Sequence, residues 1–237
     1  MKEWQSTGGR EGFLRRSAKE VRGYNRRMKL MTALLIMLLV IIMLLFVISA
    51  LYYRSGSFTV TLNKTEMTKY GLSLSESREM THLTSQLNAK IAAEITNIAG
   101  EIIPADIDEI DGEHNGVNYI AYTFYLQNRG EVAVPCEYSM DMSNITSSLD
   151  DAIRLRLYVD GTPTTYAKTK RDGSGPEPGT VEFYSSTVMA KGRIDELAPG
   201  EVVRFTVVLW IEGNDPECLD PLIGGQLKAE MKIGIVH

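Results

Sequence analysis

The residues best suited to bind a metal ion are three acids close together in the chain, Asp106, Asp108 and Asp111. Carboxylates at alternate positions before a glycine are typical of EF-hand calcium loops, which need oxygen ligands at positions 1, 3 and 5 and Gly at position 6. Counted from Asp106, position 5 is Ile110 and position 6 is Asp111, so the pattern fails by one residue. The spacing therefore favours an acidic, solvated loop, and a looser calcium site that includes Glu109 is the alternative. A second acidic segment has the same two interpretations; it holds Asn214, Asp215, Glu217 and Asp220.

The candidate nucleophiles are the two cysteines, Cys136 and Cys218. In an oxidising compartment they can form a disulfide that closes a loop of about 80 residues. Two separate thiols are the alternative, because the sequence does not place their Cβ atoms. A cysteine transpeptidase of the sortase type places its thiol at the end of a Thr-Leu-x-Thr-Cys strand, with a histidine as partner. That motif is not in this sequence, and His82, His114 and His237 have no recognisable spacing from either cysteine.

Motifs for other enzyme chemistry are missing as well. The chain has no Gly-x-Ser-x-Gly for serine hydrolysis, and the pair Gly224-Gly225 lacks the Lys of a phosphate-binding loop. Aromatic residues at strand spacing suit core packing, with a sugar-stacking groove as the alternative; they are Tyr119, Tyr122, Tyr125 and Trp210. We therefore predict that the protein is not an enzyme, with no catalytic residues and no cofactor.

Charge is distributed unevenly along the 237 residues, of which 44% are hydrophobic and 23% charged. This composition is typical of a folded protein and excludes a fully disordered chain, a collagen and a polytopic membrane protein. Residues 1–29 carry a net charge of +6 and the remainder carries −11, which together make the −5 of the whole chain. Between them, residues 30–53 hold no charge, no Pro and no Gly. As a helix this run spans about 36 Å, enough to cross a hydrocarbon core of about 30 Å.

The basic flank predicts the orientation of this helix, because Lys and Arg close to a span stay on the cytoplasmic side. Four basic residues lie directly before the apolar run: Arg22, Arg26, Arg27 and Lys29. Tyr52 and Tyr53 suit the interfacial belt on the other side. We therefore expect a cytoplasmic tail, a transmembrane helix and an extracytoplasmic domain, formed by residues 1–29, 30–53 and 54–237.

The alternative interpretation of the apolar run is a signal peptide that is cleaved. The apolar core of a signal peptide has about 7–15 residues, which is shorter than this run, and the candidate cleavage sequences over residues 47–50 are poor. We therefore expect a retained anchor in the cell membrane, with the lipid bilayer as its first partner. The basic residues beside it attract anionic lipid by about 1 kcal/mol each and do not indicate nucleic-acid binding.

The chain after the apolar run is patterned mainly as strands, because apolar and polar residues alternate between turn signals. The expected strands cover residues 57–63, 71–75, 119–127, 132–142, 153–159, 164–167, 181–188, 202–212 and 226–236. Turn signals at 128–130 and 160–161 predict two hairpins. Residues 86–98 are ambiguous between helix and strand, and residues 100–116 and 168–180 are loops. We predict a mainly β fold, an antiparallel, jelly-roll-like β-sandwich preceded by one transmembrane α-helix.

Three short sequence segments after the apolar run resemble those of known proteins. They are Tyr-Thr-Phe-Tyr-Leu-Gln-Asn-Arg-Gly at 122–130, Leu-Ala-Pro-Gly-Glu at 197–201 and Val-Val-Leu-Trp-Ile-Glu-Gly-Asn-Asp-Pro-Glu-Cys at 207–218. With the basic and apolar N-terminal segment, they resemble uncharacterised anchored surface proteins of Gram-positive Firmicutes. More remotely, the chain is similar to the TasA and camelysin group of secreted matrix-fibre proteins. The resemblance covers about residues 117–236 and implies a jelly-roll domain with a surface or matrix role, without catalytic residues.

The predicted function is that of a single-pass cell-surface protein whose β-sandwich acts by interaction, in a structural or adhesive role in envelope or matrix. One alternative is a ligand-binding accessory module of a secretion or wall-processing system, which a concave groove lined by Tyr and acidic residues would favour. Another is a secreted matrix-fibre subunit after signal cleavage. The expected partner is an extracellular protein or the cell wall, and exposed edge strands would favour assembly.

Overall fold

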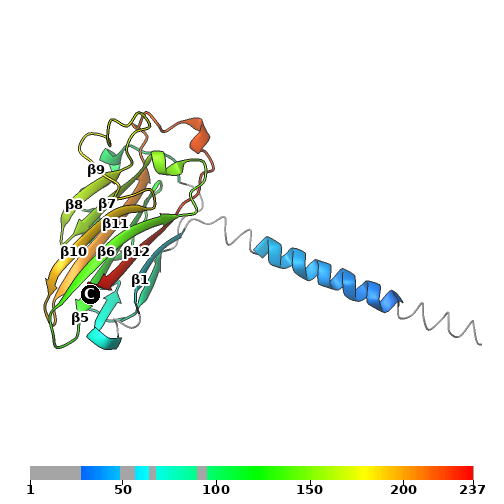
Figure 1. Ribbon diagram of the computed structural model, residues 1–237, viewed down its shortest axis with the longest axis horizontal. Helices are drawn as coiled ribbons and strands as arrows, with labels where there is room; N and C mark the ends of the chain where they lie inside the picture. The colour runs from blue at the N-terminus through cyan, green and yellow to red at the C-terminus, as the bar shows by residue number, and fades with distance from the viewer. Residues whose placement is uncertain (1–27, 49–56, 64–67, 90–94, 237) are drawn as a thin grey trace, which may run out of the picture. The chain divides into compact units, whose positions relative to one another are not determined.

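The structure is a computed structural model that describes residues 28–48, 57–63, 68–89 and 95–236. The chain divides into two compact units, Met1–Arg54 and Ser55–His237, and each is described by itself. In the first unit, Met28–Ile48 is a continuous helix of 21 residues, long and apolar enough to cross a membrane (Figure 1). Every residue of this helix is exposed. A helix that is apolar on all sides is stable only in an apolar surrounding such as lipid or against a partner.

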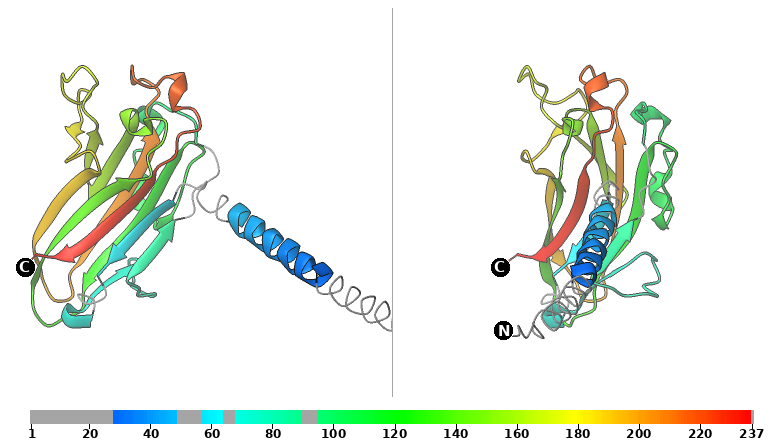
Figure 2. Two further views of the ribbon diagram at one scale, coloured as in Figure 1. Left: turned by 45° about the vertical axis from the view of Figure 1, so that its right-hand side comes forward. Right: turned by 90° about the vertical axis from the view of Figure 1, so that its right-hand side faces the viewer.

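The second unit is a β-sandwich of two sheets (Figures 1 and 2). Sheet A has the strand order β10-β6-β12-β1-β3, which are Val188–Leu197, Val134–Ser143, Lys228–Ile235, Ser57–Leu62 and Gln86–Ala89. Sheet B has the order β2-β5-β11-β7-β8-β9, which are Leu72–Ser75, Tyr119–Asn128, Val202–Ile211, Ile153–Val159, Thr162–Ala167 and Val181–Glu182, with β4, Gly112–Glu113, beside β5. Short 3₁₀ helices lie in the connections: η1 Gly100–Ile102, η2 Ile107–Glu109, η3 Leu149–Asp151 and η4 Asp220–Leu222. The predicted mainly β sandwich with one apolar helix is confirmed.

The hairpin predicted from the turn at residues 128–130 is wrong. β5 pairs with β2, β4 and β11 in sheet B, whereas β6 pairs with β10 and β12 in sheet A. Both edges of β5 are occupied by other strands, so β6 has no place beside it and the chain crosses to the opposite sheet.

Asn128 joins this crossing to the turn before β11. Its buried side-chain Nδ2 donates hydrogen bonds to the carbonyl oxygens of Val132 at 2.9 Å and Leu197 at 2.8 Å. Its backbone oxygen accepts a hydrogen bond from the backbone N of Gly200 at 2.7 Å. Two of the phrases that carried the resemblance, at 122–130 and 197–201, are therefore in contact and have a structural role.

The hairpin predicted at Asp160-Gly161 is confirmed. β7 and β8 pair antiparallel with Val159 opposite Thr162. Asp160 and Gly161 have φ angles of 47° and 81°. Two successive positive φ angles are what a two-residue turn of type I′ requires, because its twist matches that of the strands.

Two other expectations about the sheets are corrected. Of the strand predicted over 181–188, only residues 181–182 form β9, and Val188 begins β10, whose remainder the pattern did not predict. β10 shifts register twice against β6, and each bulge interrupts the alternation on which the prediction depended. The sheets are also mixed, because β1 runs parallel to β12 and β9 runs parallel to β8. β1 and β12 are far apart in the sequence, so no tight turn forces them to be antiparallel.

The main core lies between the two sheets. Its largest fully buried side chains include Phe58, Tyr122, Phe124 and Phe205. The rings of Phe124 and Phe205 stack with centroids 5.3 Å apart, and Tyr138 from sheet A meets Phe205 edge-on at 5.2 Å. These contacts join the two layers through aromatic packing.

A second, smaller core covers the outer face of sheet B. Val208 and Trp210 of β11 pack there with Ile103 and Ile107, which come from the segment between β3 and β4. The loop predicted over residues 100–116 is therefore a folded cover that contains η1, η2 and β4. Gly100 in this cover lies beside the Trp210 ring, and a cleft opens next to it.

Candidate ligand-binding cleft

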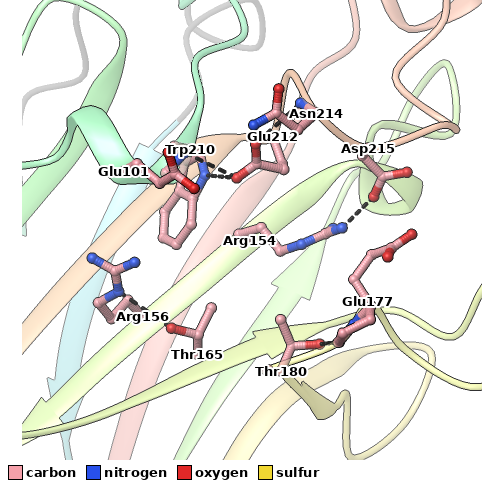
Figure 3. A pocket seen from close by; sticks show the side chains of 13 residues that line it. Glu101, Arg154, Arg156, Thr165, Glu177, Thr180, Trp210, Glu212, Asn214 and Asp215 are labelled. Carbon is pink, nitrogen blue, oxygen red and sulfur yellow. Dashed lines mark hydrogen bonds and ion pairs between the residues drawn. The ribbon is translucent and has the colours of Figure 1, made fainter.

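A cleft of about 330 Å³ lies on the outer face of sheet B (Figure 3). Side chains of β7, β8 and β11 line it, together with η1, the segment after β11 and the loop between β8 and β9. The lining combines two arginines, Arg154 and Arg156, with several acids and one tryptophan. The cleft therefore brings together groups from five separate parts of the sequence.

The carboxylate of Glu212 forms one wall and is held by three N–H donors. Its Oε2 accepts hydrogen bonds from the indole Nε1 of Trp210 at 2.9 Å and from the backbone N of Gly100 at 3.0 Å. Its Oε1 accepts a hydrogen bond from the backbone N of Asn214 at 3.1 Å. A Cβ at Gly100 would lie 2.8 Å from the Trp210 ring, so only glycine fits there. Glu212 thus fixes the position of the indole and of η1.

Arg154 and Asp215 form a closed ion pair behind the cleft. The guanidinium NH2 donates to Asp215 Oδ2, and only 3% and 4% of the two side chains are exposed. Arg154 also donates from NH1 to the backbone oxygen of Ile153 at 3.1 Å, and Asp215 Oδ1 accepts from the backbone N of Glu217 at 2.7 Å. Both charges are therefore compensated within the protein, and this pair is a structural part of the wall.

Arg156 lies two residues further along β7. Its side chain is held in position by neighbouring groups, but its charge is not paired with a carboxylate. Its Nε donates to Thr165 Oγ1 at 3.2 Å, and its guanidinium lies 5.1 Å from the centroid of the Trp210 ring, a cation–π distance. Within the described ranges no carboxylate pairs with it, and its two terminal nitrogens have no hydrogen-bond partner. The half-buried guanidinium therefore keeps N–H donors for a group that enters the cleft.

The loop between β8 and β9 supplies the opposite wall. Glu177 Oε2 pairs with Lys170 Nζ at 3.3 Å, while Glu177 Oε1 is buried without a hydrogen-bond partner among the described residues. Thr180 Oγ1 donates to the backbone oxygen of Glu177 at 2.6 Å and holds the turn. On the other side, Glu101 is exposed at the rim. The arrangement is suited to bind a small polar ligand that carries both kinds of charge.

An ion-pair cluster anchors this loop to η3. Lys168 Nζ contacts Asp150 and lies 2.7 Å from Asp151 Oδ1, and Arg171 NH2 lies 2.6 Å from Asp151 Oδ2. Burial by itself would raise the pKa of the Asp151 carboxyl, but the hydrogen bonds from Lys168 and Arg171 outweigh burial and lower it below its usual value. The same cluster raises the pKa of Lys168 despite its partial burial.

This cluster predicts an acid-sensitive contribution to stability. Because the folded-state pKa of Asp151 is lowered, its contribution is present above an unfolded pKa of about 4 and is lost as the pH falls through the folded value. We expect Asp151→Asn to lower the free energy of unfolding by about 1 kcal/mol at pH 7. The variant should lose less stability than the parent between pH 5 and 2, as measured by urea unfolding at each pH. An equal acid dependence in both proteins would contradict the prediction.

The structure does not bring the predicted calcium candidates together. Asp108 pairs with Arg204 at 2.8 Å, Asp111 accepts a hydrogen bond from the Tyr125 hydroxyl, and Asp106 is exposed before η2. In the part of the chain that the structure describes, no three acids, cysteines or histidines are grouped as metal ligands. Asp108 and Asp111 therefore serve separate contacts with different partners.

The two cysteines are separate thiols in the structure. Cys136 is buried on β6 opposite Ile235, near the end of β12. Cys218 is half-buried in the connection that precedes β12, and its Sγ accepts a hydrogen bond from Asn97 Nδ2 at 3.4 Å. The sequence left open a disulfide or two separate thiols, and in the structure both cysteines are free.

Two of the predicted aromatic residues bind carboxylates and do not line the cleft. The Tyr122 hydroxyl donates to Glu76 and the Tyr125 hydroxyl to Asp111. Burial, with the hydrogen bond to Asp111, raises the pKa of Tyr125 to about 12, and burial with the Glu76 contact also raises the pKa of Tyr122. Of the four aromatic candidates only Trp210 reaches the cleft, and its indole is 3% exposed beneath Arg156.

The residues predicted to set membrane topology are placed only in part. Lys29 lies in the first turn of the helix Met28–Ile48. The others lie outside the described residues; they are Arg22, Arg26, Arg27, Tyr52 and Tyr53.

The arginines of the cleft were not predicted as site residues. The strand pattern placed Arg154 and Arg156 on the polar face of an alternating strand, where solvated side chains are the usual outcome. Two arginines on one face of a strand predict a binding site only weakly. The neighbouring strand and the segment that covers the sheet complete the site, and the sequence does not show where they lie.

The fold and the cleft define the class of this protein as a β-sandwich domain that follows one apolar helix. No protein-family model matches the chain, and no curated protein matches it. The assignment of function therefore depends on the geometry of the helix, the sandwich and the cleft.

Proposed function

We propose that the chain is a single-pass membrane protein whose β-sandwich acts by binding at the cell surface, in a structural or adhesive role in the envelope or matrix. The observation that carries this proposal is the helix Met28–Ile48, which has 21 residues and is exposed throughout. At 1.5 Å per residue it is about 32 Å long, which matches the hydrocarbon core of a bilayer. From residue 30 to residue 48 it has no charged side chain that would oppose insertion.

The basic residues before this helix support an orientation with the N-terminus in the cytoplasm and the β-sandwich outside the cell membrane. Nine Lys or Arg precede the apolar run within residues 1–29, whereas the chain beyond the run is acidic overall. Positive charge close to a span is retained in the cytoplasm. The partner of the sandwich is then an extracellular protein or the wall.

We include in this proposal a jelly-roll form of the sandwich, and its support is the way the chain alternates between the two sheets. Strands β1, β12, β6 and β10 are neighbours in sheet A, and β5, β11, β7 and β8 are neighbours in sheet B. From β5 to β12 the chain changes sheets repeatedly, as the interleaved Greek keys of jelly rolls do.

One edge of sheet A, formed by β10, does not favour assembly by strand addition. β10 is an edge strand in the described sheet, with two register shifts and a charged segment that includes Lys191, Arg193 and Asp195. Bulges and charges of this kind protect an edge from pairing with another chain. This edge therefore gives no support to a secreted fibre subunit.

A second candidate function is a ligand-binding accessory module of a secretion or wall-processing system. The observation that favours it is the cleft of about 330 Å³, which is lined by acids and by an arginine with free donors. A surface that served only for packing or adhesion has no need of an oriented, unpaired guanidinium.

Membrane fractionation of the native host tests the first proposal. We expect the intact 26.4 kDa chain in the membrane pellet after an alkaline wash, and removal of the β-sandwich by protease added outside protoplasts. Leu38→Arg combined with Leu39→Arg places two charges near the centre of the helix, at a cost of about 2.5–3.5 kcal/mol each, and should move the chain out of the pellet. Val117→Arg, at a residue 87% exposed on the sandwich, is the matched control and should leave it there. A released chain that begins near residues 50–57 would overturn the anchor and favour the secreted alternative.

A further inference from the structure

We infer that the cleft on the outer face of sheet B binds a small zwitterion, an amino acid or the end of a short peptide, with Arg156 as the group that takes its carboxylate. This inference rests on the ligand-binding form of the proposed function and names the ligand class of that site. It is carried by the contrast between the two arginines of β7, of which one is satisfied by the protein and the other is not.

The two arginines differ in the number of hydrogen-bond donors that remain available to a ligand. Arg154 is 3% exposed on its side chain and is paired with Asp215, so a ligand would have to compete with a buried ion pair. Arg156 has only its Nε engaged, by Thr165, and its guanidinium carbon lies 5.1 Å from the centroid of the Trp210 ring. A planar guanidinium that is engaged only at Nε keeps two terminal nitrogens, which match the two oxygens of a carboxylate.

The acids around Arg156 select against a purely anionic ligand. Glu101, Glu177 and Glu212 line the same cleft, so a multiply charged anion such as phosphate meets repulsion from three carboxylates. An ammonium group meets attraction from the same residues. A ligand with one carboxylate and one ammonium therefore satisfies both signs of charge, whereas a simple anion or cation satisfies only one.

Glu101 is the carboxylate best placed to take the ammonium group. The oxygens of Glu212 already accept three N–H donors. Glu177 is paired with Lys170 through Oε2, and its Oε1 has no hydrogen-bond partner among the described residues but is buried. Glu101 is exposed at the rim and has no hydrogen-bond partner within the described ranges. Glu101 and Arg156 both line the cleft, and Figure 3 labels their side chains. The carboxylate and the ammonium group of one small ligand therefore have separate binding residues, Arg156 and Glu101.

The size of the cleft agrees with this class of ligand. Its volume of about 330 Å³ is near the lower end of the range of about 300–1,000 Å³ that is typical of small-molecule sites. A dipeptide fits such a volume, whereas a folded protein segment does not.

Calorimetry with a defined probe tests the inference. The full chain in detergent micelles is titrated with alanyl-alanine, and we expect saturable binding with a dissociation constant below about 10 mM. N-acetyl-alanyl-alanine and alanyl-alanine amide each lack one charge and should bind at least about tenfold more weakly. Inorganic phosphate should bind more weakly than the dipeptide. Equal binding of phosphate, or no saturable binding of the dipeptide, would overturn the inference.

Two variants locate the binding at the cleft. Arg156→Lys keeps the charge but removes the planar fork, and it should weaken dipeptide binding at least about tenfold. Arg193→Lys on β10, whose side chain is 53% exposed, is the matched control and should leave binding unchanged. Glu101→Gln lies on the exposed rim, so folding is not at risk, and it should weaken binding of the dipeptide but not of its N-acetylated form. Unchanged affinity in both Arg156→Lys and Glu101→Gln would place the binding elsewhere and refute this assignment.

Trp210 gives an independent optical signal for the same site. The sequence has two tryptophans, so Trp4→Phe leaves the indole under Arg156 as the only tryptophan, which excitation at the red edge of the absorption band selects over the tyrosines. We expect the dipeptide to change this emission with the same midpoint as in calorimetry, because a carboxylate bound to the guanidinium beside the ring changes the electrostatic environment of the indole. Binding heat without any change in this emission would contradict a role for Arg156.

The outcomes also separate this inference from the anchored function. If the chain stays in the membrane pellet but binds no dipeptide, the membrane anchor is retained as a proposal and the cleft assignment is rejected. If the chain is absent from the pellet but binds the dipeptide, the cleft assignment is retained and the membrane anchor is rejected.

Discussion

Replacing Asp215 with asparagine is expected to lower the free energy of unfolding by about 3–5 kcal/mol, because it leaves the guanidinium of Arg154 buried without a counter-charge. The two side chains are only 3% and 4% exposed, so water cannot compensate for the lost carboxylate. A loss of this size is a large fraction of the roughly 5–15 kcal/mol that stabilises a typical domain. Urea unfolding of the full chain in detergent, followed by circular dichroism, measures the change.

Asp195→Asn is the matched control for that experiment. Asp195 pairs with Arg193 at 2.9 Å, but the two side chains are 90% and 53% exposed, and exposed pairs contribute about 0–1 kcal/mol. The double variant Arg154→Met, Asp215→Leu removes both charges and should recover most of the loss, because no unpaired charge remains. If Asp215→Asn is no more destabilising than Asp195→Asn, the buried pair does not have the role described here.

Phe205→Ala is expected to destabilise the sandwich by about 3–5 kcal/mol, the range for truncating a buried aromatic ring. Phe205 is fully buried on β11, stacked on Phe124 of the same sheet and in edge contact with Tyr138 of the opposite sheet. Truncation leaves a cavity at the point where the two layers meet, and the neighbouring strands of sheet B limit how far the core can collapse. The same unfolding experiment gives the change in free energy.

Tyr184→Ala provides the comparison for the aromatic truncation. Tyr184 is 66% exposed in the segment between β9 and β10, so removing its ring should change stability by no more than about 0.5 kcal/mol. Phe205→Leu keeps part of the volume and should fall between the two. A small effect of Phe205→Ala would mean that the layers are not joined through this ring.

The local sequence pattern predicted part of the candidate site. The alternation over residues 153–159 correctly placed Arg154 and Arg156 on the polar face of their strand. The pattern could not distinguish the partners of these two side chains, because Asp215 lies 61 residues from Arg154 in the sequence and Trp210 comes from the neighbouring strand. The acids at 106–111 illustrate the opposite case, since their spacing resembled a metal loop but the fold pairs Asp108 with Arg204 and Asp111 with Tyr125.

The sequence by itself determined the apolar helix, the mainly β class and the turn at Asp160-Gly161. Each depends on neighbouring residues alone: an uninterrupted apolar run, the alternation of side chains along a strand, and two positions that tolerate positive φ. Only the tertiary structure decided that β5 and β6 belong to opposite sheets, that β10 forms an edge, and that a cover over Trp210 opens a cleft beside Arg156. These features depend on contacts between residues far apart in the chain, and many pairings of the same strands would satisfy the same local pattern.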